Sequence, residues 1–354
     1  TILPWYGGSS MVWSTCLLFF QVVLLLGYTY AHLLTKLTPH RQASIHVCLI
    51  VVACTLLPIT PDPMWKPQGE FSPTWHILSL LATHVGLPYF LLSATSPLVQ
   101  VWYGQIYESR SPYRLYALSN LGSMLALLSY PFIVEPSLDT ITQGHYWSVA
   151  FVIFSALVAY LTILILKSSH ALSTPKPQRD KNHVFSTTIQ STPIQSTTSS
   201  PELRRHNLGR QFLWFILPAC ASVTLLAITN HLSQDVAVIP FLWIFTLSLY
   251  LLSFILCFDH PRWYNRNVFA SATIVLSVFL GISSLEESLL FKPSFYYYMP
   301  NLAWDIRLEV GIYTSLLFLI CMLCHGELTR QKPSTSRLSY FYLLMSAGSA
   351  AGAA

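Results

Sequence analysis

The sequence has very few charged residues. Only 9% of its 354 residues are Asp, Glu, Lys or Arg, whereas 53% are hydrophobic, and the mean hydropathy is +0.51. A soluble domain of average composition has about 25% charged residues, so this chain has too few charges to cover a globular surface with solvated groups. The shortage excludes an ordinary soluble domain and indicates an integral membrane protein. We expect the lipid bilayer as its surroundings and no nucleic-acid partner.

Three further features are missing. The seven cysteines form no regular framework, and the apolar runs that hold most of them favour cysteine as a small hydrophobic residue rather than a disulfide partner. The pattern G-x-G does not occur, so the sequence has no glycine-rich nucleotide loop. No nucleophile, base and orienting group stand at a spacing that indicates an intramembrane enzyme. We therefore expect no catalytic residue, no cofactor and no metal in this chain.

Long apolar runs dominate what is present. About 20 apolar residues are needed to cross the hydrocarbon core of a membrane as a helix. Ten runs approach this length, and the sequence therefore predicts an all-α, polytopic transmembrane helical bundle with about ten spans. The predicted spans are residues 11–34, 43–59, 76–100, 115–134, 146–166, 211–231, 236–257, 267–285, 304–324 and 338–354. The chain starts without Met and stops inside a predicted helix, so we expect it to be truncated at both ends.

The basic residues alternate between the predicted loops. Lys and Arg accumulate in the cytoplasmic loops of membrane proteins. With ten spans, all but three of the 19 Lys and Arg residues fall on one side, and the exceptions are Lys66, Lys292 and Arg307. The alternation supports the number of spans and predicts that the odd-numbered spans end in the cytoplasm. Most acidic residues lie on the other side, so we expect an acidic outer face.

One segment differs from the rest in composition. Residues 168–208 are rich in Ser, Thr, Pro and Gln and nearly lack apolar side chains, so they cannot bury enough surface to fold. We predict that they form a disordered cytoplasmic linker. The linker separates a first set of transmembrane helices, residues 1–167, from a second set, residues 209–354, which is truncated at its C-terminus.

A short similarity crosses this linker. "YALSNLGS" (residues 116–123) and "YLLMSAGS" (residues 342–349) share the pattern Y-x-L-x-x-x-G-S. Both are predicted to run in the same direction, which favours a parallel repeat, although small residues also recur wherever membrane helices pack closely. One more helix at each end of the chain would give six plus six helices, as in the parallel halves of major-facilitator transporters. Gly122 and Gly348 would then be equivalent helix-packing positions, and a bulky substitution at either should damage assembly to a similar degree.

Five ordered motifs carry a resemblance to a known family. They are "LPWYGGSSMVWSTCLLFFQVVLLLGYTYAHLL", "LSATSPLVQVWYG", "SPYRLYALSNLGSMLALLSYPFIVEP", "NHLSQDVAVIPFLWIFTLSLYLLSFILCFD" and "CHGELTRQKPS" followed by "LSYFYLLMSAGSAAG". Together they resemble the membrane portion of bacterial fused proteins that join a transporter-like, major-facilitator-like half to a spermidine-synthase-like half. The resemblance implies a multi-pass protein of the bacterial inner membrane. It also implies a soluble aminopropyltransferase-like domain in cis, which this chain lacks.

The segment "CMLCH" at residues 321–325 has the spacing that attaches a c-type haem. It is predicted to lie at the cytoplasmic end of a span, whereas haem is ordinarily attached on the outer side of the bacterial membrane. We therefore favour a packed helix end and predict no bound haem. The alternatives for "CHGE" at residues 324–327 are a gate, a contact with the missing soluble domain, or a divalent-metal site completed by His32 or His260.

Polar side chains inside a membrane are energetically costly and are therefore candidate sites. His84 and Asn120 fall within predicted spans, and the loop "NHLSQD" (residues 230–235) is unusually polar for a short connection. Interhelical hydrogen bonds and capped helix ends are the alternatives. The candidate polar or gating residues are His32, His84, Asn120, His231, Asp235, Glu309, His325 and Glu327.

Two functional classes follow from these patterns. The first is a transporter-like carrier for a small cation such as a polyamine, favoured by the six-plus-six count and the acidic, aromatic-rich outer face. The second is a non-transporting membrane anchor or regulatory platform for the soluble domain. The second class is favoured by the family resemblance and by the lack of a carboxylate in the middle of any predicted span.

Overall fold

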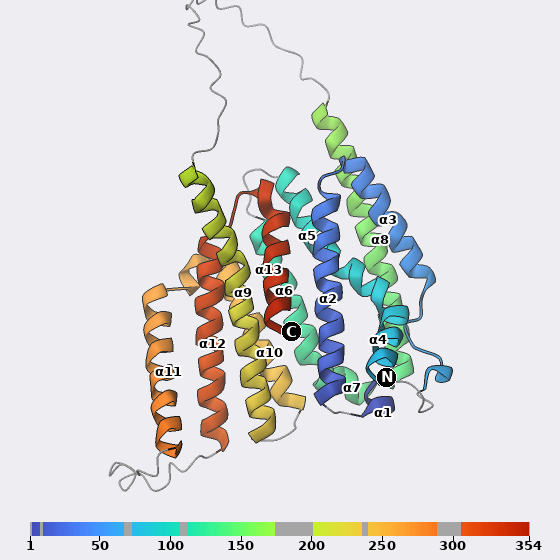
Figure 1. Cartoon of the computed structure of the whole chain (residues 1–354). Helices are drawn as coiled ribbons and strands as arrows, with labels where there is room; N and C mark the ends of the chain where they lie inside the picture. The colour runs from blue at the N-terminus through green and yellow to red at the C-terminus, as the bar shows by residue number, and fades with distance from the viewer. Residues whose placement is uncertain are drawn as a thin grey trace, which may run out of the picture.

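The structure is a computed structural model that describes residues 2–7, 10–66, 73–106, 112–173, 201–235, 240–288 and 306–353. Every regular element within these residues is a helix, and the long helices stand side by side as a bundle (Figure 1). The predicted all-α class is therefore confirmed. The physical reason is that a helix satisfies all its backbone hydrogen bonds within one segment, as a membrane requires.

The helices follow one another with alternating direction, except that α4 continues into α5 and α6 into α7 (Figure 1). In the first set they are α1 (Ile2–Tyr6), α2 (Ser10–Leu34), α3 (Pro39–Thr55), α4 (Pro73–Leu81), α5 (Leu87–Ile106), α6 (Tyr113–Ser129), α7 (Glu135–Ser137) and α8 (Thr140–Ser173). In the second set they are α9 (Pro201–Asp235), α10 (Pro240–Asp259), α11 (Arg266–Ser288), α12 (Ile306–Arg330) and α13 (Leu338–Ala353). The C-terminal ends of α2, α5, α8 and α12 lie at the same end of the bundle, which is the end that the basic loops follow in the sequence.

Eight helical stretches of the described residues are long and apolar enough to cross a membrane. They are Thr15–Leu34, Pro73–Ile106, Tyr113–Ser137, Thr140–Leu166, Leu208–Ser233, Phe241–Asp259, Pro261–Ile282 and Arg307–Arg330. Two of the ten predicted spans, now α3 and α13, form helices of 17 and 16 residues. At a rise of about 1.5 Å per residue such helices extend over roughly 25 Å, less than the ~30 Å hydrocarbon core. The eight apolar stretches of the described residues therefore indicate a multi-pass membrane protein.

Short irregular helices complete two of these spans. A π-helical turn, Ala82–Gly86 (η2), joins α4 to α5, and a second, Tyr130–Val134 (η3), joins α6 to α7. Three-residue 3₁₀ helices lie at Pro63–Trp65 (η1), Pro261–Trp263 (η4) and Thr335–Arg337 (η6). The span predicted at residues 76–100 is therefore longer than the pattern indicated, and it continues through the π turn.

The ends of the predicted linker are helical. Helix α8 continues to Ser173 and α9 begins at Pro201, so residues 168–173 and 201–208 are not irregular as predicted. Proline is well suited to the first helical position because its missing N–H has no partner there in any case. The rest of the predicted linker, residues 174–200, lies outside the described residues, and its disorder stays a prediction.

Two helix pairs make the most extensive contacts between the first set and the second. Helix α2 packs against α13, and α6 packs against α10. A cluster of buried aromatic side chains fills the junction, and within it the rings of Tyr116 and Tyr342 are stacked with their centroids 5.2 Å apart. The two tyrosines hold the same place in the two Y-x-L-x-x-x-G-S segments.

The glycines of these two segments have different surroundings. A Cβ atom added to Gly348 would lie 2.0 Å from the carbonyl oxygen of Phe215, and one added to Gly352 would lie 2.3 Å from that of Ala219. Helix α13 thus packs on α9 through a small residue every fourth position, the G-x-x-x-G arrangement of close membrane helices. A Cβ atom added to Gly122 would meet nothing within 4 Å. The prediction that Gly122 is a helix-packing position is therefore wrong, because no described helix covers that face of α6.

Candidate functional site

A cavity of about 510 Å³ lies between the two helix sets, where α2, α5 and α6 face α10 and α13. Its volume falls within the range of about 300–1,000 Å³ that is usual for small-molecule sites. We call it the central cavity. Its polar lining consists of Gln21, Tyr28, Tyr89, Ser93, Ser96, Tyr116, Ser119, Asn120, Ser123, Tyr250, Ser346 and Ser349.

The lining of the central cavity is polar but uncharged. Among the described residues that form it there is no Asp, Glu, Lys, Arg or His. Leucines from α2, α5, α6 and α10 and the ring of Phe254 separate the hydroxyl and amide groups. Such a surface offers hydrogen bonds and aromatic faces to a solute without a fixed charge to attract or repel ions.

Two polar atoms of the lining have no protein partner. The Oε1 atom of Gln21 and the Oγ atom of Ser346 are buried and make no hydrogen bond within the described structure. Ser346 as a whole is only 5% exposed. Leaving a buried polar group without a partner costs about 1–3 kcal/mol, so each is a position at which a bound molecule would gain a hydrogen bond.

The candidate residue Asn120 belongs to this cavity. Its Nδ2 atom donates a hydrogen bond to the carbonyl oxygen of Tyr116 at 2.8 Å, which leaves its Oδ1 atom as an acceptor. Asn120 and Ser346 hold the same place in the two repeated segments, as do Ser123 and Ser349, and all four line the cavity.

A buried network lies behind one wall of the cavity. Tyr342 donates its hydroxyl to Oε1 of Gln100, and Nε2 of Gln100 donates to Oγ of Ser96 at 3.2 Å. Ser96 lines the cavity, whereas Gln100 and Tyr342 are almost fully buried at 2% and 0% exposure. The network therefore links the stacked tyrosine pair to a side chain that faces the cavity.

His325 lies behind the part of the lining that α10 contributes. Its ring stacks on Phe254 with the centroids 3.6 Å apart, and its Nδ1 atom is 2.8 Å from Oγ of Ser253. Ser253 donates its one hydroxyl proton to the carbonyl oxygen of Tyr250, so Nδ1 of His325 is the donor to Ser253. The Nε2 atom is buried without a partner. His325 is fully buried and supports the aromatic wall formed by Tyr250 and Phe254.

The two cysteines of the "CMLCH" segment are buried as well. Cys321 is 0% exposed and Cys324 is 7% exposed, and both pack in an apolar cluster with side chains of α9 and α10. The predicted packed helix end is thus what the structure contains, and the absence of haem stays a prediction. No group of three or more potential metal ligands occurs among the described residues. His32 lies 3.0 Å from Oγ of Ser339, and His260 accepts a hydrogen bond from the backbone of Arg262.

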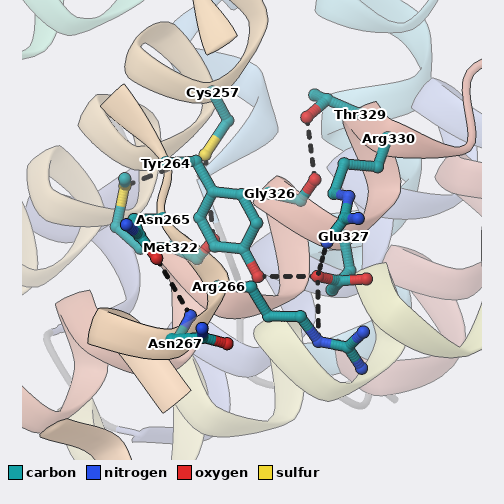
Figure 2. A network of polar contacts seen from close by, with 10 residues as sticks. All are labelled: Cys257, Tyr264, Asn265, Arg266, Asn267, Met322, Gly326, Glu327, Thr329 and Arg330. Atoms are coloured by element: carbon teal, nitrogen blue, oxygen red, sulfur yellow. Dashed lines mark hydrogen bonds and ion pairs between the residues drawn. The ribbon is translucent and has the colours of Figure 1, made fainter. Parts of the chain in front are cut away.

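Glu327 is the centre of a separate polar cluster (Figure 2). Its Oε1 atom accepts a hydrogen bond from the Tyr264 hydroxyl at 2.9 Å and lies 3.3 Å from Nη1 of Arg330 and 3.5 Å from Nε of Arg266. The Tyr264 ring lies flat against Gly326, where an added Cβ atom would be 2.3 Å from Cδ2 of the ring. Gly326 and Glu327 therefore pack α12 against the connection between α10 and α11.

The other candidates lie away from the central cavity. His84 is in the π turn η2, where its Nδ1 atom is 3.0 Å from the carbonyl oxygen of Leu80 and its ring meets the edge of Trp65. It lines a different cavity of about 440 Å³ between α2, α4 and α8. The Nε2 atom of His231 on α9 lies 3.4 Å from Oε1 of Glu309 on α12. Asp235 is the last residue of α9, and its side chain is not described.

Most of the cavity lining was not predicted from the sequence. The missed signal is a set of hydroxyl residues three or four positions apart within apolar spans, which places them on one helix face. The pairs are Ser93 and Ser96, Ser119 and Ser123, and Ser346 and Ser349.

No family model, no curated protein and no solved structure matches this chain. The likeness to fused transporter-like and spermidine-synthase-like proteins therefore stays a prediction from the five motifs.

Proposed function

We propose that the chain is a membrane carrier for a small, polar, uncharged solute that binds in the central cavity. The observation that carries the proposal is that two buried atoms of cavity-lining residues, Gln21 Oε1 from the first helix set and Ser346 Oγ from the second, have no hydrogen-bond partner within the described structure. A solute with hydroxyl or amide groups would supply both hydrogen bonds. Sites between two helix sets are the usual location for substrates of transporters built from repeats.

The arrangement of helices supports two related halves. If α6 corresponds to α13, as the repeated segments suggest, then α2 corresponds to α10. The contact between α2 and α13 is then equivalent to the contact between α10 and α6. The counterpart of α9 would then precede α2, where the only described helix is the short α1. The cavity would lie on the axis relating the halves, where rocking of one half against the other gives alternating access.

The chemistry of the lining argues for an uncharged solute over a polyamine. A polyamine carries several ammonium groups, and removing them from water requires carboxylates or other compensating groups. The described lining has none, although its four tyrosines and Phe254 offer aromatic faces. The absence of a carboxylate and of a histidine in that described lining also favours passive exchange over proton coupling.

We further propose that the chain lies in the bacterial inner membrane with its basic loops in the cytoplasm. The alternating basic residues and the family resemblance support this orientation. Cysteine labelling of intact cells tests it. A cysteine introduced within residues 174–200 should react only after permeabilisation, and a reaction in intact cells would reverse the orientation.

The carrier proposal is tested by uptake into proteoliposomes of the purified chain. A panel of radiolabelled polyols and small amides is compared with spermidine as the polycationic solute. Ser346→Ala and Asn120→Ala should weaken binding by about threefold to tenfold, the value of one hydrogen bond. Ser315→Ala is the matched control, because Ser315 is exposed on α12 and its hydroxyl donates to Gly311 of the same helix.

Two results would contradict the proposal. One is uptake of spermidine in preference to every uncharged solute, which would restore the polyamine prediction. The other is the absence of uptake and of thermal stabilisation by any solute of the panel. The second result would favour the platform for a soluble domain, which the uncharged lining also fits.

A further inference from the structure

A small basic pocket lies where α9 meets the segment between α12 and α13. Its volume is about 260 Å³, and its lining includes Arg210, Trp214, Ser334, Ser336 and Arg337. None of these residues lines the central cavity. We call it the basic pocket.

The walls of the basic pocket are held in place by hydrogen bonds. Trp214 is 2% exposed, and its indole Nε1 donates to the carbonyl oxygen of Gln331 at 3.0 Å. The Tyr113 hydroxyl donates to the carbonyl oxygen of Pro333 at 2.6 Å. The backbone N–H of Arg337 donates to the carbonyl oxygen of Ser334 at 3.1 Å. The segment that carries the serines and Arg337 is thus fixed against both helix sets.

The pocket has an excess of positive charge. Within the described residues, neither Arg210 nor Arg337 has an ion-pair partner. Glu327, the carboxylate in the last turns of α12, is already bound by Arg266 and Arg330. The hydroxyl groups of Ser334 and Ser336 share a hydrogen bond of 3.1 Å, which leaves one of their two protons to be donated to a bound molecule.

We propose that the basic pocket binds a phosphate group, supplied either by the headgroup of an anionic lipid or by free phosphate. The guanidinium group of arginine matches a phosphate with two parallel hydrogen bonds, and serine hydroxyls can bind the remaining oxygens. The pocket adjoins the ends of two membrane spans, the start of Leu208–Ser233 and the end of Arg307–Arg330. Basic pockets at this depth are where lipid headgroups are recognised.

The test uses the full chain in nanodiscs and in detergent. Retention of phosphatidylglycerol is measured by native mass spectrometry in mixed phosphatidylglycerol and phosphatidylcholine discs, and binding of inorganic phosphate is measured by calorimetry in detergent. The variants are Arg210→Gln, Arg337→Gln and the double variant. Arg262→Gln is the matched control, because Arg262 is an exposed arginine in η4 that does not line the pocket.

Each arginine removed should weaken phosphate binding by about tenfold, while the control keeps its affinity. Loss of phosphatidylglycerol retention without any binding of inorganic phosphate would identify the lipid as the source. Binding of inorganic phosphate that is lost in the double variant, with unchanged lipid retention, would identify the free anion. The proposal would be overturned if the double variant retained phosphatidylglycerol and bound inorganic phosphate as the native chain does. It would also be overturned if Arg262→Gln weakened either as much as the pocket variants do. Circular dichroism and thermal unfolding in phosphatidylcholine discs check that the variants are folded.

Discussion

Helix α13 lies so close to α9 that replacing Gly348 by Ala should separate the two helices. The new Cβ atom would lie 2.0 Å from the Phe215 carbonyl oxygen and 2.9 Å from its carbonyl carbon. Since Cβ atoms essentially never come within 3.0 Å of another heavy atom, the helices must move apart by at least about 1 Å. The obstacle is backbone, which cannot rotate away as a side chain can. Overpacking of this kind costs about 1–3 kcal/mol.

Gly122→Ala is the control with the same local sequence pattern. Its Cβ atom meets nothing within 4 Å, so no separation is needed, and alanine is favoured over glycine in a helix by about 0.8–1 kcal/mol. The two substitutions should therefore change the free energy of unfolding in opposite directions. Unfolding of the purified chain in mixed micelles, with denaturing detergent as the titrant and circular dichroism as the signal, measures both.

Equal effects of Gly348→Ala and Gly122→Ala would refute this reasoning. So would a neutral Gly348→Ala, because it would mean that α13 does not approach α9 as closely as the described contact requires. Gly352→Ala gives a second reading of the same contact, since its Cβ atom would lie 2.3 Å from the Ala219 carbonyl oxygen.

Three more outcomes are expected. Ser253→Ala removes the partner of the buried His325 Nδ1 atom and should lower the free energy of unfolding by about 1–3 kcal/mol, so a neutral result would contradict the assigned hydrogen bond. Tyr264→Phe and Glu327→Gln should couple in a double-mutant cycle by about 0.5–1.5 kcal/mol because their hydroxyl and carboxylate are in contact, and additive effects would show that they do not interact. Hydrogen bonds from the Thr142 hydroxyl and backbone lower the pKa of the Asp139 carboxyl below its usual 3.8. The ionised carboxylate of Asp139 therefore stabilises the folded state at pH values above 3.8. This stability is lost as the pH falls through the lower pKa of the folded state. Asp139→Ala should therefore lower the melting temperature at pH 7, with a gap that narrows below pH 3.8, and a constant gap would remove the electrostatic part of the explanation.

Much of the fold follows from the sequence alone. Long apolar runs with few charges have one stable form in a bilayer, because only a helix pairs its own backbone groups within the segment. The prediction fails where the local sequence does not decide the length, as in the π turn that extends the span ending at Ile106, and in α3 and α13, whose described helices are short.

The candidate site was much less accessible to sequence reasoning. Asn120 was recognised because a lone amide in a span is costly, whereas Ser93 and Ser346 are ordinary residues of membrane helices. Their spacing relative to other hydroxyl groups places each on a helix face, but it does not say which helix that face meets. The cavity exists because five helices from two sets bring such faces together.

Residues with the same local sequence pattern can also have different neighbours, which the sequence does not reveal. The helical class and the polar or small residues that each helix carries follow from the sequence, because they depend on the solvent and on local backbone chemistry. Only the tertiary structure decided that Gly348 meets a backbone while Gly122 meets open space, and that Glu327 contacts Tyr264 and Arg266 more than 60 positions earlier in the chain. These contacts depend on which helices are neighbours. Neighbours are selected by the packing energy between two helix surfaces, and a single stretch of sequence contains only one of the two.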